Sequence, residues 1–279
     1  MSILSAVIQG IIQGLTEFLP VSSSGHLSLY QHFSGQSGEG SLLFSAVLHM
    51  GTLIAVFIVF RRRITDMIRE TALIVKNIFT GRFSRKDLTP DGRGVIMIVL
   101  SLLMLLPFYI FRDVFESVSE DSDIIAEGIC FIYTAVLLFM TDRCKNTNKT
   151  MGDITPKNAV TVGFFQGLAL LPGVSRSGST IAGGTFCGFD RDTAVEYSFI
   201  LGIPAILGGC FLEGKKAFET GTAMNTDPIC MAVGLAASAI VGVIAIRLVK
   251  FISNGRKFKV FGVYTLILGV CTVIAGIVD

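Results

Sequence analysis

The chain has 279 residues, of which 51% are hydrophobic and only 16% are charged, and its mean hydropathy is +0.68. This composition excludes a soluble globular protein, which has no use for so much apolar surface, and indicates an integral membrane protein. The net charge of +2 is small enough that its distribution matters more than its sum, and no stretch resembles a nucleic-acid-binding face, so we expect no nucleic-acid partner.

The apolar segments predict an all-α membrane protein. In chain order they are a broken segment at roughly 2–33, runs near 43–60, 95–111 and 125–141, a second broken segment at roughly 158–189, and runs near 194–212, 229–247 and 259–278. Each of the six uninterrupted runs can cross a bilayer, which takes about 20 helical residues. Proline, glycine and serine interrupt the two broken segments, so each is either one kinked span or a re-entrant helical hairpin.

The two broken segments are copies of each other. Residues 13–26 align without a gap on residues 166–179, pairing Gln13 with Gln166 and Ser22 with Ser175, and the same offset pairs Ser45 with Ser198. This pattern predicts a single membrane domain over 1–279 that contains repeat one at about 1–142 and repeat two at about 154–279.

Loop charges predict how the repeats are oriented. Residues 61–93, 142–157 and 247–259 are rich in lysine and arginine, whereas 112–127 and 213–227 carry more acids than bases. The positive-inside rule therefore places the first three connections in the cytoplasm and the other two outside. Because the connections at 142–157 and 247–259 lie on the same side, the chain between them crosses the membrane an even number of times. The runs near 194–212 and 229–247 already supply two crossings, so the second broken segment must return to the side from which it entered. We predict six transmembrane helices, two re-entrant hairpins and an inverted-topology repeat; two kinked spans are the alternative.

Two opposite charges fall inside the breaks. Arg176 lies in the middle of the second break, where insertion scales assign an arginine about 2.5–3.5 kcal/mol. Glu17 lies in the first break, four residues after Gln13 and therefore on the same helix face. Charge inside a membrane indicates a functional site, although a buried ion pair that only joins the two copies is the structural alternative.

Small polar residues accompany both charges. The candidates are Ser22, Ser23 and His26 in the first break and Ser175, Ser177 and Thr180 in the second. Hydroxyl groups, helix-end N–H groups and one arginine suit a phosphate oxyanion, and a carboxylate suits a base or a divalent cation. We interpret His32 and His49 as interfacial histidines, and the six cysteines as small apolar residues.

These residues carry a resemblance to a known family. Residues 13–26, Gln-Gly-Leu-Thr-Glu-Phe-Leu-Pro-Val-Ser-Ser-Ser-Gly-His, and residues 172–180, Pro-Gly-Val-Ser-Arg-Ser-Gly-Ser-Thr, resemble the two motifs of the undecaprenyl-diphosphatase, or bacitracin-resistance protein, family. Gln13 stands where many members have glutamate. The resemblance covers the whole chain.

The resemblance implies hydrolysis of undecaprenyl diphosphate to undecaprenyl phosphate on the outer side of a bacterial plasma membrane. This reaction recycles the lipid carrier for cell-wall synthesis and confers bacitracin resistance. The expected partners are this isoprenoid diphosphate lipid, the bilayer and a second copy in a homodimer, and the expected cofactor is Mg²⁺ or Ca²⁺. By position, the catalytic residues would be Glu17, Ser23, His26 and Arg176. Phosphate-binding residues would be Gln13, Ser22, Ser175, Ser177 and Thr180, and metal ligands would be Glu17 and Gln13.

In the mechanism that we expect, Arg176 holds the diphosphate while Ser23 or a water attacks the terminal phosphorus. Glu17 or His26 serves as the base. A polyprenyl-phosphate transporter or flippase built on the same repeats is the alternative function. A phosphatidic-acid-phosphatase-type enzyme is rejected, because its second motif would need a histidine at Ala182.

Overall fold

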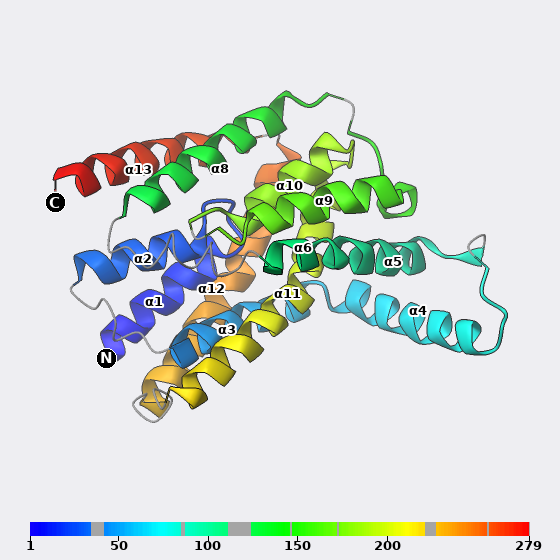
Figure 1. The fold of residues 1–279 in the computed structure, drawn as a ribbon, viewed down its shortest axis with the longest axis horizontal. Helices are drawn as coiled ribbons and strands as arrows, with labels where there is room; N and C mark the ends of the chain where they lie inside the picture. The colour runs from blue at the N-terminus through cyan, green and yellow to red at the C-terminus, as the bar shows by residue number, and fades with distance from the viewer. Residues whose placement is uncertain are drawn as a thin grey trace.

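The computed structural model describes residues 1–34, 42–84, 87–110, 124–145, 147–171, 173–220, 227–255 and 257–278. These residues form α-helices and one 3-10 turn, η2 (Met151–Asp153), and contain no strand (Figure 1). Six helices are long and apolar enough to cross a membrane, which confirms the predicted all-α membrane class. Most of the predicted connection at 112–127, and residues 221–226 of the one at 213–227, lie outside the described residues.

The six apolar helices follow the predicted runs closely. They are α3 (Leu42–Val59), α5 (Pro90–Leu103) continued by α6 (Leu105–Ile110), α8 (Ile125–Arg143), α11 (Arg191–Glu219), α12 (Pro228–Asn254) and α13 (Lys259–Val278). Two helices continue beyond their predicted ends: α11 reaches Glu219 where the sequence predicts an end near 212, and α12 reaches Asn254 where it predicts an end near 247. Glu213, assigned from sequence to an external connection, is therefore a helical residue.

The basic connection after α3 is also helical. α4 (Arg61–Phe79) lies beside α5, as Figure 1 shows. The side chain of Arg63 ties the start of this pair to the rest of the protein, because it donates to both Asp91 of α5 and Glu196 of α11.

Each broken segment forms two short helices around a non-helical break. The first contains α1 (Ile3–Thr16) and α2 (Ser23–Phe33), and the second contains α9 (Pro156–Leu168) and α10 (Arg176–Phe186). The offset of 153 that aligns the sequences also brings α2 onto α10. At about 1.5 Å per residue, none of these four helices is long enough to cross a bilayer of about 30 Å alone.

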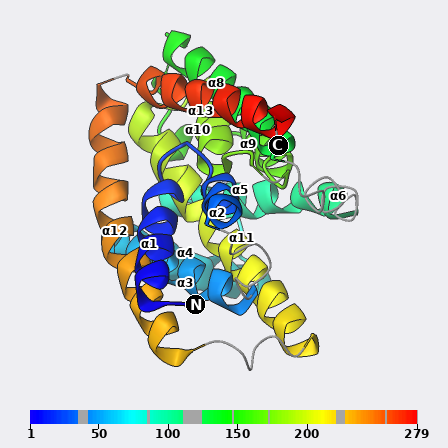
Figure 2. The same ribbon diagram turned by 90° about the vertical axis from the view of Figure 1, so that its left-hand side faces the viewer.

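Small residues let the helices around the first broken segment approach closely. α1 and α3 both pack against α12, and Gly14 lies directly on the backbone of Ser238 (Figure 2). A Cβ at Gly14 would be only 2.6 Å from the Ser238 carbonyl oxygen. Small residues are typical of such membrane-helix interfaces, where packing rather than the hydrophobic effect drives association.

The two breaks meet in the interior. The Gly173 N–H donates to Ser24 Oγ at 3.3 Å, and Ser177 Oγ donates to the Leu19 carbonyl at 3.3 Å. The polar parts of the two copies, separated widely in sequence, are thereby joined, with the largest cluster of buried apolar side chains packed around them.

The contact between α1 and α12 predicts a stability effect. Replacing Gly14 with alanine should lower the free energy of unfolding by about 1–3 kcal/mol, because overpacking forces the two helices apart. Thermal unfolding in detergent measures this as a lower midpoint. Gly214→Ala on α11 is the matched control, since nothing lies within 4 Å of a Cβ there. An unchanged midpoint in Gly14→Ala would contradict the close approach.

Candidate active site

Glu17 is placed by the end of α1. The helix ends at Thr16, and the Glu17 N–H still donates to the Gln13 carbonyl at 3.0 Å. The chain cannot continue as a helix through Pro20, which has no N–H to donate. It then turns at Ser22, whose φ of 73° is uncommon for a residue other than glycine. This turn leaves the Glu17 carboxylate at the break.

The Glu17 carboxylate is 8% exposed and is surrounded by donors. Its Oε1 accepts from Arg176 Nη2 at 2.5 Å, and its Oε2 accepts from Ser23 Oγ at 2.8 Å and from Gln13 Nε2 at 3.0 Å. His49 Nε2 lies 3.8 Å from the same Oε2. The predicted pairing of carboxylate and guanidinium across the two copies is therefore present in the structure.

Arg176 is the first residue of α10, and α11 is shaped to receive its side chain. Nη1 donates to the Ser198 carbonyl at 3.3 Å, and the guanidinium lies against Gly202. A Cβ at Gly202 would be 2.2 Å from Nη1, so only glycine leaves room for the guanidinium in this position. The cation is thus fixed between Glu17 and α11.

Two helices begin at this site. Ser22 caps α2 by accepting from the Gly25 N–H at 3.3 Å, and Ser175 caps α10 by accepting from the Gly178 N–H at 3.0 Å. A helix N-terminus carries unpaired N–H groups and a partial positive charge, which favour a bound anion. Two such ends and one arginine at one place are suited to a phosphate group.

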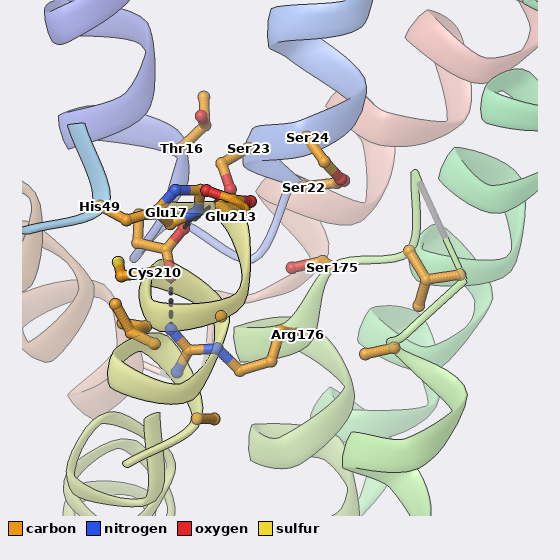
Figure 3. A pocket seen from close by; sticks show the side chains of 15 residues that line it. Thr16, Glu17, Ser22, Ser23, Ser24, His49, Ser175, Arg176, Cys210 and Glu213 are labelled. Carbon is orange, nitrogen blue, oxygen red and sulfur yellow. Dashed lines mark hydrogen bonds and ion pairs between the residues drawn. The ribbon is translucent and has the colours of Figure 1, made fainter. Parts of the chain in front are cut away.

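A cavity of about 210 Å³ lies at the meeting point of the breaks. Figure 3 shows its polar side chains, with Glu17 and Arg176 joined by an ion pair. The lining residues are Thr16, Glu17, Ser22, Ser23, Ser24, His49, Ala169, Val174, Ser175, Arg176, Ala205, Ile206, Gly209, Cys210 and Glu213.

The cavity brings together five of the residues predicted from sequence, and three others support it from behind. The five are Glu17, Ser22, Ser23, Ser175 and Arg176. Of the supporting residues, Gln13 reaches the site through its hydrogen bond to Glu17. Ser177 is buried against Leu19, and Thr180 Oγ1 lies 2.6 Å from Ser198 Oγ. Direct phosphate binding by Ser177 and Thr180 stays a prediction, because their hydroxyls are engaged in joining the breaks and α11.

His26 points to a different part of the protein. Its Nδ1 donates to the Ser22 carbonyl at 2.6 Å, its Nε2 lies 2.8 Å from the Tyr264 hydroxyl on α13, and its ring packs edge-on against Phe131. His26 does not line the cavity. In this arrangement it holds the turn at Ser22, and its predicted role as a catalytic acid or base stays a prediction.

Two titratable residues that the sequence analysis did not select do line the cavity. His49 extends from α3, and Glu213 extends from the part of α11 beyond its predicted end. One oxygen of Glu213, Oε2, is buried without a hydrogen-bond partner. A helical pattern that places Ile206, Cys210 and Glu213 on one face of α11 was the available signal.

The divalent cation implied by the resemblance can be tested against these side chains. Among the described residues, no three acidic, histidine or cysteine side chains are grouped so that they could hold a metal ion alone. Gln13 Oε1, however, is buried without a partner beside Glu17. Mg²⁺ commonly takes one or two protein ligands and completes its shell with substrate phosphates and water. The residues fit a cation that binds together with a diphosphate.

The fold and the cavity define a multi-pass membrane protein with a polar cavity between two duplicated, broken segments. Within that class, the chain belongs to the family described as Bacitracin resistance protein BacA, which matches residues 6–271. The family resemblance predicted from the two motifs is confirmed.

Several curated relatives match over nearly their whole length. The undecaprenyl-diphosphatase of Alkaliphilus metalliredigens is 39% identical over 270 residues, covering 96% of this chain and 97% of the relative. The undecaprenyl-diphosphatase of Desulforapulum autotrophicum is 36% identical and covers 100% of both chains. Undecaprenyl-diphosphatase 4 of Bacillus thuringiensis subsp. konkukian is 37% identical, covering 97% of this chain and 96% of the relative.

The contact between Glu17 and Arg176 predicts that Glu17 competes with a bound anion for the guanidinium. Because Glu17 occupies the guanidinium, Glu17→Gln should bind inorganic pyrophosphate up to about tenfold more tightly than the unchanged protein, a gain of about 1.4 kcal/mol. Arg176→Ala should bind it far more weakly. Calorimetric titration in detergent measures both affinities. Weaker binding by Glu17→Gln would show that Glu17 assists the anion rather than competing with it.

Proposed function

We propose that this protein hydrolyses undecaprenyl diphosphate to undecaprenyl phosphate and inorganic phosphate, and so recycles the lipid carrier for cell-wall synthesis and confers bacitracin resistance. The observation that carries this proposal is the buried contact of Ser23, Glu17 and Arg176 at the start of two helices. The names of the full-length relatives support the same reaction.

The diphosphate binds where the Glu17 carboxylate now contacts Arg176. Phosphate oxygens take the guanidinium hydrogen bonds and the N–H groups at the start of α2 and α10, as Ser22 and Ser175 position those helix ends. The same donors neutralise the charge that develops on the transferred phosphoryl group and on the leaving phosphate. Little rearrangement is needed, because Gly202 and Ser198 already hold the arginine from the other side.

Ser23 is positioned as the nucleophile and Glu17 as its base. Ser23 Oγ donates to Glu17 Oε2 at 2.8 Å, the arrangement of an activated hydroxyl. Ser23 Oγ forms a bond to the terminal phosphorus while its proton passes to Glu17, and the bond from that phosphorus to the bridging oxygen breaks. Undecaprenyl phosphate leaves with the electron pair. Water then hydrolyses the phosphoserine, releasing inorganic phosphate and restoring the Ser23 hydroxyl.

A divalent cation, Mg²⁺ or Ca²⁺, supplies further charge neutralisation when it is bound with the substrate. Glu17 and the free amide oxygen of Gln13 are the protein groups that would hold it. His26 keeps the turn at Ser22 in place through Nδ1, and in that way orients Ser23 at the start of α2.

The two broken segments are proposed to be re-entrant hairpins of an inverted repeat, within one membrane domain over 1–279. The entry and exit of the second segment are bonded to each other, since the Lys149 N–H donates to the Gly188 carbonyl and the Asp190 N–H donates to the Lys149 carbonyl. In the first, Tyr30 near the end of α2 reaches Ser5 near the start of α1. The loop charges support an active site on the outer side of a bacterial plasma membrane. Assembly as a homodimer stays a prediction.

Activity of the purified protein tests the reaction. Phosphate release from undecaprenyl diphosphate should fall at least about 100-fold in Ser23→Ala, Glu17→Ala and Arg176→Ala, the range expected when a base or an electrostatic stabiliser is removed. Chelation should abolish activity, and added Mg²⁺ or Ca²⁺ should restore it.

Glu219→Ala is the matched control, because Glu219 is an exposed residue of α11 that pairs with the surface residue Lys215. It should retain full activity. Movement of the lipid across vesicles without phosphate release would instead favour the transporter or flippase. Normal turnover by Ser23→Ala would assign the attack to water.

Labelling of single cysteines tests the topology. In a background without the native cysteines, Lys157→Cys at the start of α9 and Asp192→Cys at the start of α11 should both react with an impermeant maleimide only from the cytoplasmic side. Lys215→Cys near the end of α11 should react from outside. Labelling of positions 157 and 192 from opposite sides would replace the re-entrant hairpin with a kinked span.

A further inference from the structure

The cavity is large enough for the diphosphate but not for the lipid attached to it. Its volume of about 210 Å³ is below the range of about 300–1,000 Å³ that holds a drug-sized ligand. A long isoprenoid chain must therefore leave the cavity and continue along the outside of the protein. The inference about the route of this isoprenoid chain rests on the proposed function.

The cavity has two chemically different walls. One wall carries charged and hydroxyl side chains from the end of α1, from α3 and from the starts of α2 and α10, and Glu213 adds a carboxylate from farther along α11. The other is made of small or apolar residues from two places, the connection between α9 and α10 and one face of α11. These apolar lining residues are Ala169, Val174, Ala205, Ile206 and Gly209. An isoprenoid chain next to its diphosphate would contact the second wall.

The face of α11 that lines the cavity extends away from the arginine. Gly202 contacts the Arg176 guanidinium, and Ile206, Gly209 and Glu213 follow at spacings of three and four residues, which keeps them on one side of the helix. At about 1.5 Å per residue, this face runs about 16 Å along α11. The cavity thus continues along α11 from Arg176 toward Glu213.

Gly209 leaves part of this face without a side chain. A Cβ built at Gly209 meets no atom within 4 Å, so close packing does not explain the glycine there. Its φ does not require glycine either, since the described glycines with positive φ are Gly81, Gly173 and Gly188. Glycine inside a helix costs about 0.5–1 kcal/mol relative to alanine. The effect of this glycine on the structure is to keep space open beside the cavity.

The open space lies on a side of α11 that is only lightly covered. Among the described residues, α11 packs extensively on α3, α5, α10 and α12, but it makes no extensive contact with α9. Leu170 and Leu207, which directly follow the lining residues Ala169 and Ile206, are exposed apolar side chains. An apolar chain leaving the cavity here would enter surroundings as apolar as itself.

We propose that the isoprenoid chain of the substrate leaves the cavity between α11 and the α9–α10 connection, passing Ala205 and Gly209, and that Gly209 determines whether a long chain fits. The diphosphate stays at Arg176, and the first isoprene units lie against the small residues of α11. The isoprenoid chain passes through the space that a larger side chain at position 209 would fill.

Substrates that differ in chain length test this route. In Gly209→Leu, kcat/KM for undecaprenyl diphosphate should fall at least about tenfold, as expected for a blocked apolar subsite, while kcat/KM for isopentenyl diphosphate should change less than about twofold. Gly208→Leu is the matched control. It also has open space around a Cβ, but it points about 100° away around the helix and does not line the cavity. This variant should hydrolyse both substrates normally.

Each other outcome has a definite meaning. Equal loss of activity on both substrates, or no loss on either, would overturn the route past Gly209. If the unchanged protein hydrolyses neither substrate, the proposed function fails instead. Photo-crosslinking of the unchanged protein with an isoprenyl diphosphate that carries a photoreactive group on its first isoprene unit does not depend on turnover. Labels on 205–209 and 169–174 would support the route, and labels confined to other helices would overturn it.

Discussion

The ion pair between Glu17 and Arg176 is the interaction on which the rest of the site depends. Each charge alone inside the membrane would be costly, and removing one partner of a buried pair leaves the other uncompensated. The structure surrounds the pair with features that serve it: the end of α1, the start of α10 and the missing side chain at Gly202. Because the two charges come from different copies of the repeat, the pair also fixes how the copies meet.

The pair also explains how a site for an anion can exist before the anion arrives. A carboxylate presents two oxygens to a guanidinium much as a phosphate does. Glu17 therefore keeps Arg176 extended between the breaks and prevents it from turning toward the lipid surface. In the mechanism proposed above, a diphosphate takes over the arginine and leaves Glu17 beside Ser23 and His49, with its hydrogen bond from Ser23 already formed. In that mechanism, the binding of the substrate separates Glu17 from Arg176 and in the same step makes its carboxylate available as the base.

The sequence predicts much of this arrangement because the membrane restricts it. Apolar runs locate the six long helices, since a crossing requires about 20 residues. Charge within lipid identifies Glu17 and Arg176, and the duplication indicates that they belong to equivalent breaks. These inferences depend only on local composition and on the comparison of the two copies.

The remaining features depend on distant contacts that no local pattern contains. His26 is turned away from the cavity by Tyr264, which comes from the last helix. His49 resembles an ordinary histidine in an apolar helix until α1 brings Glu17 to it. Glu213 was counted with a charged connection, because the apolar run ends near residue 212 and charged residues follow, although α11 continues to Glu219. In each case the packing of one helix on another decides the role.

Ser22 illustrates how narrow the choice of residue becomes at such a break. Its backbone has a positive φ, which favours glycine, while its hydroxyl caps α2 by accepting from Gly25. Glycine would relax the backbone but remove the cap, and alanine would satisfy neither demand. Asparagine combines a short acceptor side chain with tolerance of positive φ, whereas aspartate would bring a second negative charge close to Glu17. The residues that position 22 can accommodate are therefore those with side chains that are small, uncharged and able to accept a hydrogen bond.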